Sequence, residues 1–274
     1  MSADPGPVVE RLRAAGCVFA EDEAALLIEA ASDRSELDAL VERRAGGLPL
    51  EHLLGWAEFG GLRISVAPGV FVPRRRTEAL AHEAVAALAA SASSPGSPGP
   101  AGPPVVVDLC CGTGAIGAAV AAMLLRSGAG PVDLHAAEID PVAVACARHN
   151  LAPFGGRVHA GDLDAPLPAE LRGRVSVLVA NVPYVPTDAI ATMPPEARDH
   201  EPRIALDGGA DGLDVARRVA AVAPGWLAPG GSLLIETGEE QASVLAGVFT
   251  GNGLHARVVE DYDLGSTVVI GTRP

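Results

Sequence analysis

Residues 178–184, Leu-Val-Ala-Asn-Val-Pro-Tyr, combine residue types that can recognise a planar polar group. An apolar run stops at Asn181, and Pro183 and Tyr184 follow at once. A buried strand that ends in an amide, a rigid turn and an aromatic ring builds a small flat pocket, because the amide pairs with donors and acceptors and the ring stacks. Such a pocket suits a carboxamide or an exocyclic amine. Asn and Pro also favour plain turns, so the motif alone leaves an ordinary strand-to-turn connection open.

Residues 105–117 have the pattern of a buried strand followed by a glycine-rich loop and a helix. Three valines begin the strand, Asp108 ends it, and Gly112, Gly114 and Gly117 open the helix that follows. Glycines are needed where the backbone turns tightly and where a ligand approaches with no Cβ in the way. The glycine pattern alone would also fit an ordinary strand-to-helix turn.

Acidic residues follow the next two predicted strands. Val132–Ala137 is the first of these, and it ends in Glu138, at about the distance from the loop where an acid binds ribose hydroxyls. The second lies around Arg157–His159 and precedes Asp162 and Leu163, which we assign to the adenine amino group and ring. A solvated turn is the other interpretation of that Gly-Asp pair. Strand, glycine loop, helix, strand and terminal acid together indicate an adenosine-containing cofactor at the carboxyl ends of a parallel sheet.

The charged residues narrow the choice of cofactor. All 20 basic residues are arginine, so a Walker-type phosphate loop and a Schiff-base mechanism are excluded for want of lysine. The loop alone leaves NAD possible. However, Asp108 would repel a pyrophosphate and attract a cation. S-adenosylmethionine carries a sulfonium and an ammonium group and no phosphate, so the acid-rich loop favours it.

Several further segments match one known family in the same order along the chain. They are Glu58–Glu78, which contains Val-Pro-Arg-Arg-Arg-Thr-Glu; Asn181-Val-Pro-Tyr184; Glu201-Pro202; residues 205–213; and residues 235–241. With these segments the chain resembles, from about Leu48 onward, the HemK/PrmC family of protein-(glutamine-N5) methyltransferases, which modify peptide chain release factors. The family motifs concerned are a linker hairpin with Pro-Arg-Pro-x-Thr-Glu and a catalytic Asn-Pro-Pro-Tyr.

The resemblance implies an α/β fold: a Rossmann-like class I S-adenosylmethionine-dependent methyltransferase sheet with a small N-terminal helical domain and a linking β-hairpin. It implies transfer of a methyl group from S-adenosyl-L-methionine to the side-chain amide N5 of a glutamine, in Gly-Gly-Gln of a release factor. The expected catalytic residues are Asn181, Val182, Pro183 and Tyr184. The expected cofactor-binding residues are Asp108, Cys110, Cys111, Gly112, Thr113, Gly114, Glu138, Asp162, Leu163 and Asn181.

Three positions depart from the family pattern. Val182 replaces the first proline of Asn-Pro-Pro-Tyr, Arg75 replaces a proline of the linker, and Cys110 replaces the first glycine of the loop. If position 182 acts through its backbone carbonyl, as the family implies, valine supplies the same acceptor with less rigidity. The N-terminal region matches the family least, so the resemblance supports the reaction more strongly than it supports the identity of the protein partner.

Composition and pattern predict the domain organisation. A chain of 274 residues that is 49% hydrophobic can bury a sizeable core in one or two domains. We expect a helical substrate-recognition domain over 1–55; a hairpin, a helix and a Pro/Gly/Ser-rich linker over 56–104; and the methyltransferase domain over 105–274. Finer features are helical patterns at Val8–Ala15, Glu21–Ala31 and Ser35–Arg44, a hairpin over Glu58–Val72 with its turn at Gly60-Gly61, a helix over Thr77–Ala90, and the low-complexity stretch Ser91–Pro104.

Other classes of protein fit less well. The start lacks a signal-peptide pattern, no apolar run is long enough to span a membrane, and four cysteines make no disulfide framework, so we expect a cytoplasmic enzyme. Cys146 and His149 are better interpreted as packing residues than as a metal site. The net charge of −14 argues against nucleic-acid binding, and we interpret the basic run Arg74–Arg76 as a solvated helix start.

The expected mechanism is one of positioning. The substrate amide donates its NH₂ to the Asn181 side-chain oxygen and the Val182 carbonyl, while Pro183 and Tyr184 fix its plane. Three alternatives remain. They are an adenine-N6-type nucleic-acid amino-methyltransferase, which the acidic charge disfavours; an NAD-dependent oxidoreductase, which Asp108 disfavours; and a non-catalytic S-adenosylmethionine-binding scaffold in which Val182 marks a decayed pocket.

Overall fold

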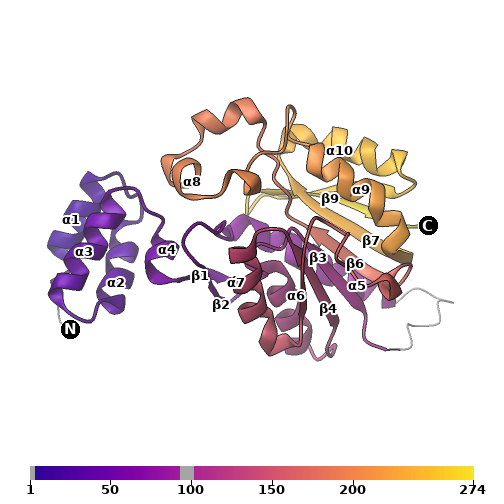
Figure 1. Ribbon diagram of the computed structural model, residues 1–274, viewed down its shortest axis with the longest axis horizontal. Coiled ribbons are helices and arrows are strands. Elements are labelled where there is room, and N and C mark those ends of the chain that lie inside the picture. Colours follow the sequence, from indigo (N-terminus) through magenta and orange to yellow (C-terminus); the bar gives the residue numbers. More distant parts are fainter. Residues whose placement is uncertain (1–3, 93–101) are drawn as a thin grey trace.

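The computed structural model describes residues 4–92 and 102–274 (Figure 1). A small bundle of helices forms the N-terminal part and lies beside the larger part that contains the sheet. Its helices are α1 (Gly6–Ala14), α2 (Ala20–Ala30), α3 (Arg34–Ala45) and α4 (Leu50–Leu54). Leu12, Leu27 and Leu37 are fully buried between them and form a separate apolar core. The three predicted helices are confirmed, and α4 is an additional short one.

A two-stranded hairpin follows the helical bundle. Its strands are β1 (Trp56–Phe59) and β2 (Leu62–Ser65). The predicted turn at Gly60 and Gly61 is confirmed, and both residues have a positive φ, of 59° and 71°. A Cβ on Gly60 would lie 2.8 Å from the Cβ of Ala119, so the turn packs directly on α6 (Ala115–Arg126). The strands end at Ser65, earlier than predicted, because Val66, Val70 and Val72 leave the hairpin to pack against α7 (Pro141–Leu151).

A seven-stranded sheet forms the centre of the larger part, in the order β5-β4-β3-β6-β7-β9-β8. All neighbouring pairs are parallel except those made by β9. The strands are β3 (Val105–Leu109), β4 (Asp133–Glu138), β5 (Arg157–Ala160), β6 (Val175–Ala180), β7 (Leu227–Thr237), β8 (His255–Asp261) and β9 (Ser266–Thr272). This order is the predicted Rossmann-like sheet of a class I methyltransferase, so the predicted fold class is confirmed.

Helices cover both faces of the sheet. On one face α5 (Glu78–Ala92), α6 and α7 pack on β3, β4 and β6, and on the other α9 (Asp214–Trp226) and α10 (Glu239–Gly251) pack on β6, β7 and β9. Shorter elements complete the chain. They are α8 (Pro195–His200), η1 (Arg75–Thr77), η2 (Ala152–Phe154), η3 (Ala169–Leu171), η4 (Thr187–Thr192) and η5 (Arg203–Ala205). Because helices cover both faces, the central strands are apolar throughout rather than alternating.

Two statements from the sequence concern the linker and the membrane. The predicted low-complexity linker, Ser91–Pro104, lies mostly outside the described residues, since 93–101 are not described. Within the described ranges, none of the helices combines the length and the apolar character needed to cross a bilayer.

Asp108 joins the central strand to the glycine loop. Its side chain is fully buried, and its Oδ2 accepts a hydrogen bond from the backbone N–H of Gly117 at 3.0 Å, while its Oδ1 has no partner. Burial raises the pKa of the Asp108 carboxyl from 3.8 to about 7; the Gly117 N–H opposes this shift and Glu138 adds to it. The folded protein therefore binds a proton at Asp108 over a pH range in which the unfolded chain has lost it.

We expect an Asp108→Asn variant to remove part of the pH dependence of stability. A raised native-state pKa stabilises the fold below the unfolded pKa and loses that contribution as pH rises through the native value. The wild-type free energy of unfolding should therefore fall relative to that of the variant between pH 4 and pH 7, by up to about 4 kcal/mol. Urea unfolding at several pH values measures this difference, and parallel pH profiles would contradict it.

Candidate active site

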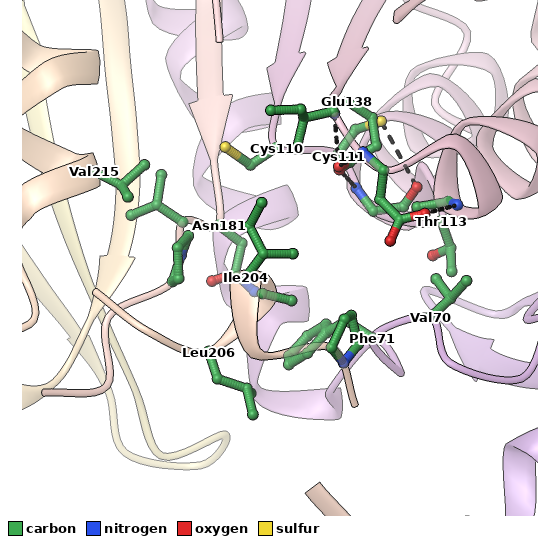
Figure 2. Close-up of a pocket in the computed structure, with 18 of the residues that line it drawn as sticks. Val70, Phe71, Cys110, Cys111, Thr113, Glu138, Asn181, Ile204, Leu206 and Val215 are labelled. Carbon is green, nitrogen blue, oxygen red and sulfur yellow. Dashed lines mark hydrogen bonds between the residues drawn. The ribbon is translucent and has the colours of Figure 1, made fainter. Parts of the chain in front are cut away.

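A cavity of about 330 Å³ opens at the carboxyl ends of β3, β4 and β6. Figure 2 shows Cys110, Cys111 and Glu138 in the upper part of the view and Thr113 to the right. Asn181 and Ile204 lie to the left, and Val70 and Phe71 lie below the loop residues. Eleven of the predicted site residues line this one cavity: Cys110, Cys111, Gly112, Thr113, Glu138, Asp162, Leu163, Asn181, Val182, Pro183 and Tyr184. Residues from four separate strand ends, those of β3, β4, β5 and β6, thus meet near the point where the strand order of the sheet reverses, which is where α/β folds bind ligands.

Glu138 holds the glycine loop in place. Its Oε2 accepts from the N–H of Gly112 at 2.8 Å, and its Oε1 accepts from the N–H groups of Ile139 and Asp140 at 2.8 and 2.9 Å. A carboxylate offers about four lone-pair positions, so Glu138 retains room for a hydroxyl donor from the cavity. Gly112 has φ +54°, and nothing lies within 4 Å of where its Cβ would be, which leaves its backbone open to a ligand.

Asp162 and Leu163 form the edge of the cavity beyond β5. Asp162 is exposed, and its Oδ2 pairs with Nη2 of Arg218 at 2.6 Å. Leu163 is buried and has a positive φ of 48°, a conformation that costs a branched residue free energy. In this conformation the Leu163 side chain lines the cavity, which is the position expected of a residue that packs against a flat ring. Cys110, at the first loop position, also has a positive φ, of 54°. The loop therefore accommodates a Cβ at this position.

Two predicted cofactor residues, Asp108 and Gly114, do not line the cavity. Asp108 lies beneath the loop, where it binds the Gly117 N–H. Gly114 has φ +77°, and a Cβ there would lie 3.0 Å from Cγ of Leu151, so this glycine lets α6 approach α7. The geometry of both residues therefore points to loop support rather than to direct contact with a ligand.

Asn181 presents an unpaired oxygen at the cavity. Its Nδ2 lies 3.5 Å from Oγ1 of Thr77, to which it donates, and its Oδ1 is buried with no hydrogen-bond partner. Buried polar atoms are rarely left unpaired, so such an atom in a cavity marks a place for a ligand donor. Thr77, the last residue of η1 before α5, fixes which way the Asn181 amide is turned.

The other residues of the motif are held by packing and by hydrogen bonds. Val182 is buried among the apolar residues of the face covered by α9, so valine leaves no gap where the family has proline. The Tyr184 carbonyl accepts from Nε2 of Gln241 at 3.0 Å, and its hydroxyl accepts from Nη2 of Arg76 at 2.6 Å. Tyr184 is therefore held at its backbone by Gln241 and at the hydroxyl end of its ring by Arg76.

Glu236 is a buried carboxylate behind Tyr184. Its side chain is 2% exposed, and its Oε1 lies 3.3 Å from Nε of Arg76. Burial raises the pKa of the Glu236 carboxyl, and the neighbouring Thr77, Arg76 and Tyr184 oppose that shift. Burial also raises the pKa of the Tyr184 hydroxyl, with Glu236 adding to the effect and Arg76 opposing it. Arg76 thus links a buried charge to the ring that forms one wall of the cavity.

Glu201 is held in the same way on the opposite side of the cavity. Its Oε1 accepts from the N–H of Val72 at 3.1 Å and from Nη2 of Arg74 at 2.6 Å, while its Oε2 is unpaired. Burial raises the pKa of this carboxyl, and Arg74 opposes the shift. Our interpretation of the basic run as a solvated helix start is therefore wrong for Arg74 and Arg76. Both guanidiniums line the cavity and neutralise carboxylates from distant parts of the chain.

The sequence analysis also missed an apolar wall. Val70, Phe71, Ile204, Leu206 and Val215 line the cavity around Asn181 (Figure 2). The guanidinium carbon of Arg74 lies 4.9 Å from the centre of the Phe71 ring. Val70 and Phe71 lie in the family-like segment 58–78 and Leu206 lies in 205–213, but no role was expected of these residues. Ile204 and Val215 lie outside every segment that the sequence singled out.

The arrangement fits S-adenosylmethionine. The cavity offers an open backbone at Gly112, a carboxylate with spare acceptor capacity at Glu138, and unpaired acceptors at Asn181 and Glu201. Acceptors and acidic groups suit a cofactor that carries two positive charges and no phosphate. Such a cofactor would be held by Gly112, Glu138 and Asp162.

Comparison with known proteins agrees with this chemistry. No family model matches the chain. Over 226 residues, 82% of this chain and 74% of the other, it is 40% identical to the release factor glutamine methyltransferase of Mycolicibacterium smegmatis. Over 216 residues, 78% of this chain and 69% of the other, it is 38% identical to that of Geobacter sulfurreducens.

Two further similarities complete the comparison. The chain is 36% identical over 218 residues to the 4-amino-L-phenylalanine/4-methylamino-L-phenylalanine methyltransferase of Streptomyces pristinaespiralis, covering 79% of this chain and 70% of that one. A solved structure of ribosomal protein L11 methylase from Lactobacillus delbrueckii subsp. bulgaricus superposes with a TM-score of 0.49 at 14% identity, over 77% of this chain and 84% of that one. On the extent and level of its identity to these relatives, the protein belongs to the release factor glutamine methyltransferase family.

Proposed function

We propose that this protein transfers a methyl group from S-adenosyl-L-methionine to the side-chain amide N5 of a protein glutamine, in Gly-Gly-Gln of a peptide chain release factor. The observation that carries the proposal is the unpaired, buried Oδ1 of Asn181 in a cavity shared with the glycine loop. Family membership supports both the cofactor and the reaction. A cytoplasmic location belongs to the same proposal. So does the absence of direct nucleic-acid binding, because a net charge of −14 opposes contact with phosphates.

Recognition of the amide follows from the motif. A glutamine side chain has an NH₂ with two donors, and Oδ1 of Asn181 accepts one of them. The backbone carbonyl of Val182 is the second acceptor in this proposal. Pro183 and the fixed ring of Tyr184 restrict the plane of the amide, so the nitrogen is aimed rather than merely bound.

Catalysis in this proposal is largely positioning. When bound, S-adenosylmethionine would supply an electrophilic methyl group on a sulfonium, so that the S–CH₃ bond breaks as the N–CH₃ bond forms, the neutral thioether leaves and the amide nitrogen gives up one proton to solvent. An amide nitrogen is a weak nucleophile because its lone pair is delocalised, and two acceptors on its protons increase its electron density. Thr77 keeps Oδ1 of Asn181 facing the cavity, and Arg76 keeps Tyr184 in place. Fixed acceptors lower the barrier because they need no reorganisation during the reaction.

We propose that the helices of residues 1–55 help to recognise the protein substrate. Arg44 on α3 is buried and bonds to Glu23 on α2 at 2.6 Å and to Glu196 on α8 at 2.6 Å. Glu201, at the end of α8, lines the cavity. The helical bundle is therefore connected through one guanidinium to the segment that borders the substrate site. The division of the chain into a recognition domain (1–55), a linking region (56–104) and a methyltransferase domain (105–274) is part of this proposal.

A second candidate is methylation of an aromatic amine in a small molecule. One relative acts on 4-amino-L-phenylalanine by name, and the apolar wall of Phe71, Ile204 and Leu206 offers space for a ring beside Asn181. The same acceptors would bind an aryl NH₂. Both candidates use one pocket, so they differ in substrate and not in mechanism.

We expect labelled methyl to pass from S-adenosylmethionine to purified release factor at its Gly-Gly-Gln glutamine. The control is a release factor in which that glutamine is replaced by alanine, and it should take up no label. Adenine-containing DNA and 4-amino-L-phenylalanine serve as parallel substrates. Label on either of these and none on the release factor would favour the corresponding alternative. Cofactor binding with no turnover on any substrate would favour the scaffold.

An Asn181→Ala variant should lose methyl-transfer rate while keeping the cofactor. Loss of one preorganised group at a reacting centre lowers kcat by roughly 10²-fold. Single-turnover rates and calorimetric binding of S-adenosylmethionine separate the two effects. An equal loss of rate and of cofactor affinity would refute the assignment of Asn181 to the substrate.

A Thr77→Val variant should lower kcat by roughly fivefold, because one hydrogen bond worth about 1 kcal/mol no longer orients Asn181. Valine has the same shape and no acceptor, and Thr77→Ser is the matched control because it keeps the hydroxyl. We expect the serine variant to retain most of the rate. If both variants lose rate equally, Thr77 acts through packing and not through Asn181.

A further inference from the structure

A second cavity adjoins the active site. It has a volume of about 280 Å³, and Tyr184 and Arg76 line both cavities. It lies at the carboxyl end of β7, between the start of α10 and the turn that joins β8 to β9. We call it the acidic cavity. No step proposed above uses it.

The acidic cavity carries an excess of negative charge. Four carboxylates line it, from Glu236, Glu239, Glu260 and Asp261, and Arg76 is the single basic side chain in its lining. That guanidinium is already engaged, with Glu236 at 3.3 Å and with the Tyr184 hydroxyl at 2.6 Å. The cavity therefore attracts a further cation, and the attraction is strengthened because part of the lining is buried.

Two buried acceptor atoms in this lining lack partners. Oε2 of Glu236 and Oγ of Ser266 have no hydrogen bond, although the two residues are only 2% and 4% exposed. Buried polar atoms are nearly always paired, and two unpaired ones in one small cavity require a donor. Within the described residues, no group of three or more His, Cys, Asp or Glu side chains is arranged to hold a metal ion. An organic cation with several N–H donors meets these requirements.

We infer that the acidic cavity binds a lysine or arginine side chain of the protein substrate, a few residues from the methylated glutamine. The inference rests on the proposed function, because it assumes that a polypeptide lies across Tyr184. Tyr184 and Arg76 line both cavities, so a substrate chain whose glutamine amide reaches Asn181 would meet the acidic cavity if it continues past Tyr184. The cation would pair with Glu236 and Glu239, and its N–H groups would donate to Ser266. In this inference the substrate needs a positively charged side chain near the glutamine as well as the glutamine itself.

Methyl-transfer kinetics on full-length release factor at saturating S-adenosylmethionine test the inference. The enzyme variants are Glu239→Gln and Ser266→Ala, and Glu240→Gln is the matched control, an exposed neighbour on α10 outside the lining. In the substrate, each Lys or Arg within about five residues of the glutamine, a reach of up to roughly 17 Å of extended chain, is replaced in turn by Met.

One substrate replacement should raise KM roughly tenfold, as expected for the loss of a charged hydrogen bond, with kcat little changed. Glu239→Gln and Ser266→Ala should raise KM for the native factor but not for that replaced factor, whereas Glu240→Gln should change neither. Thermal unfolding of Ser266→Ala should match the wild type, because the hydroxyl has no partner to lose.

Two results would overturn the inference and can be told apart. In the first result, the glutamine is methylated and none of the substrate or enzyme replacements changes KM. This result would reject the acidic cavity as a substrate site and leave the proposed function intact. No methylation of the glutamine in any release factor would reject the proposed function, and this inference with it.

Discussion

The parallel pairing of β3 with β4 and β6 at their carboxyl ends is the constraint on which the site depends. Leu109 pairs with Ala137 on one side and with Ala180 on the other, so these three residues form one row across the sheet. The residues that follow them, Cys110, Glu138 and Asn181, therefore lie at the same level, although Glu138 is still part of β4 and pairs with Ala160 of β5. A slip of one residue in a strand would turn its side chains to the opposite face, and full burial of the strands opposes such a slip.

Buried carboxylates bind the remaining segments to this frame. Glu201 and Glu236 would be costly to bury alone, because removing a charge from water is offset only by a close partner. Arg74 and Arg76, which lie more than 120 positions earlier in the chain, supply those partners. The segment between the hairpin and α5 is therefore fixed against the catalytic motif. Its position depends on charge pairing as well as on apolar packing.

The polar groups of the site fall into two kinds. Glu138 shapes the loop by accepting from three backbone N–H groups, and its remaining acceptor capacity faces the cavity. Asp108 supports the loop from below through Gly117 and keeps one unpaired oxygen. Asn181, Glu201, Glu236 and Ser266, which line the two cavities, also have one unpaired atom each. The hydrogen bonds hold the loop in place, and the unpaired atoms in the cavities indicate which ligands the site can bind.

The sequence by itself determined the sheet class, the glycine loop, the acid after each strand and the Asn-x-Pro-Tyr motif, because each is a local pattern of turn chemistry and apolar runs. It also predicted the hairpin turn at Gly60. Only the tertiary structure decided the roles of Arg74, Arg76 and Glu236, since a charge run has the same local pattern whether it is solvated or paired. The tertiary structure also decided that Asp108 and Gly114 support the loop and do not line the cavity. Long-range contacts assign such roles, and spacing along the chain does not encode them.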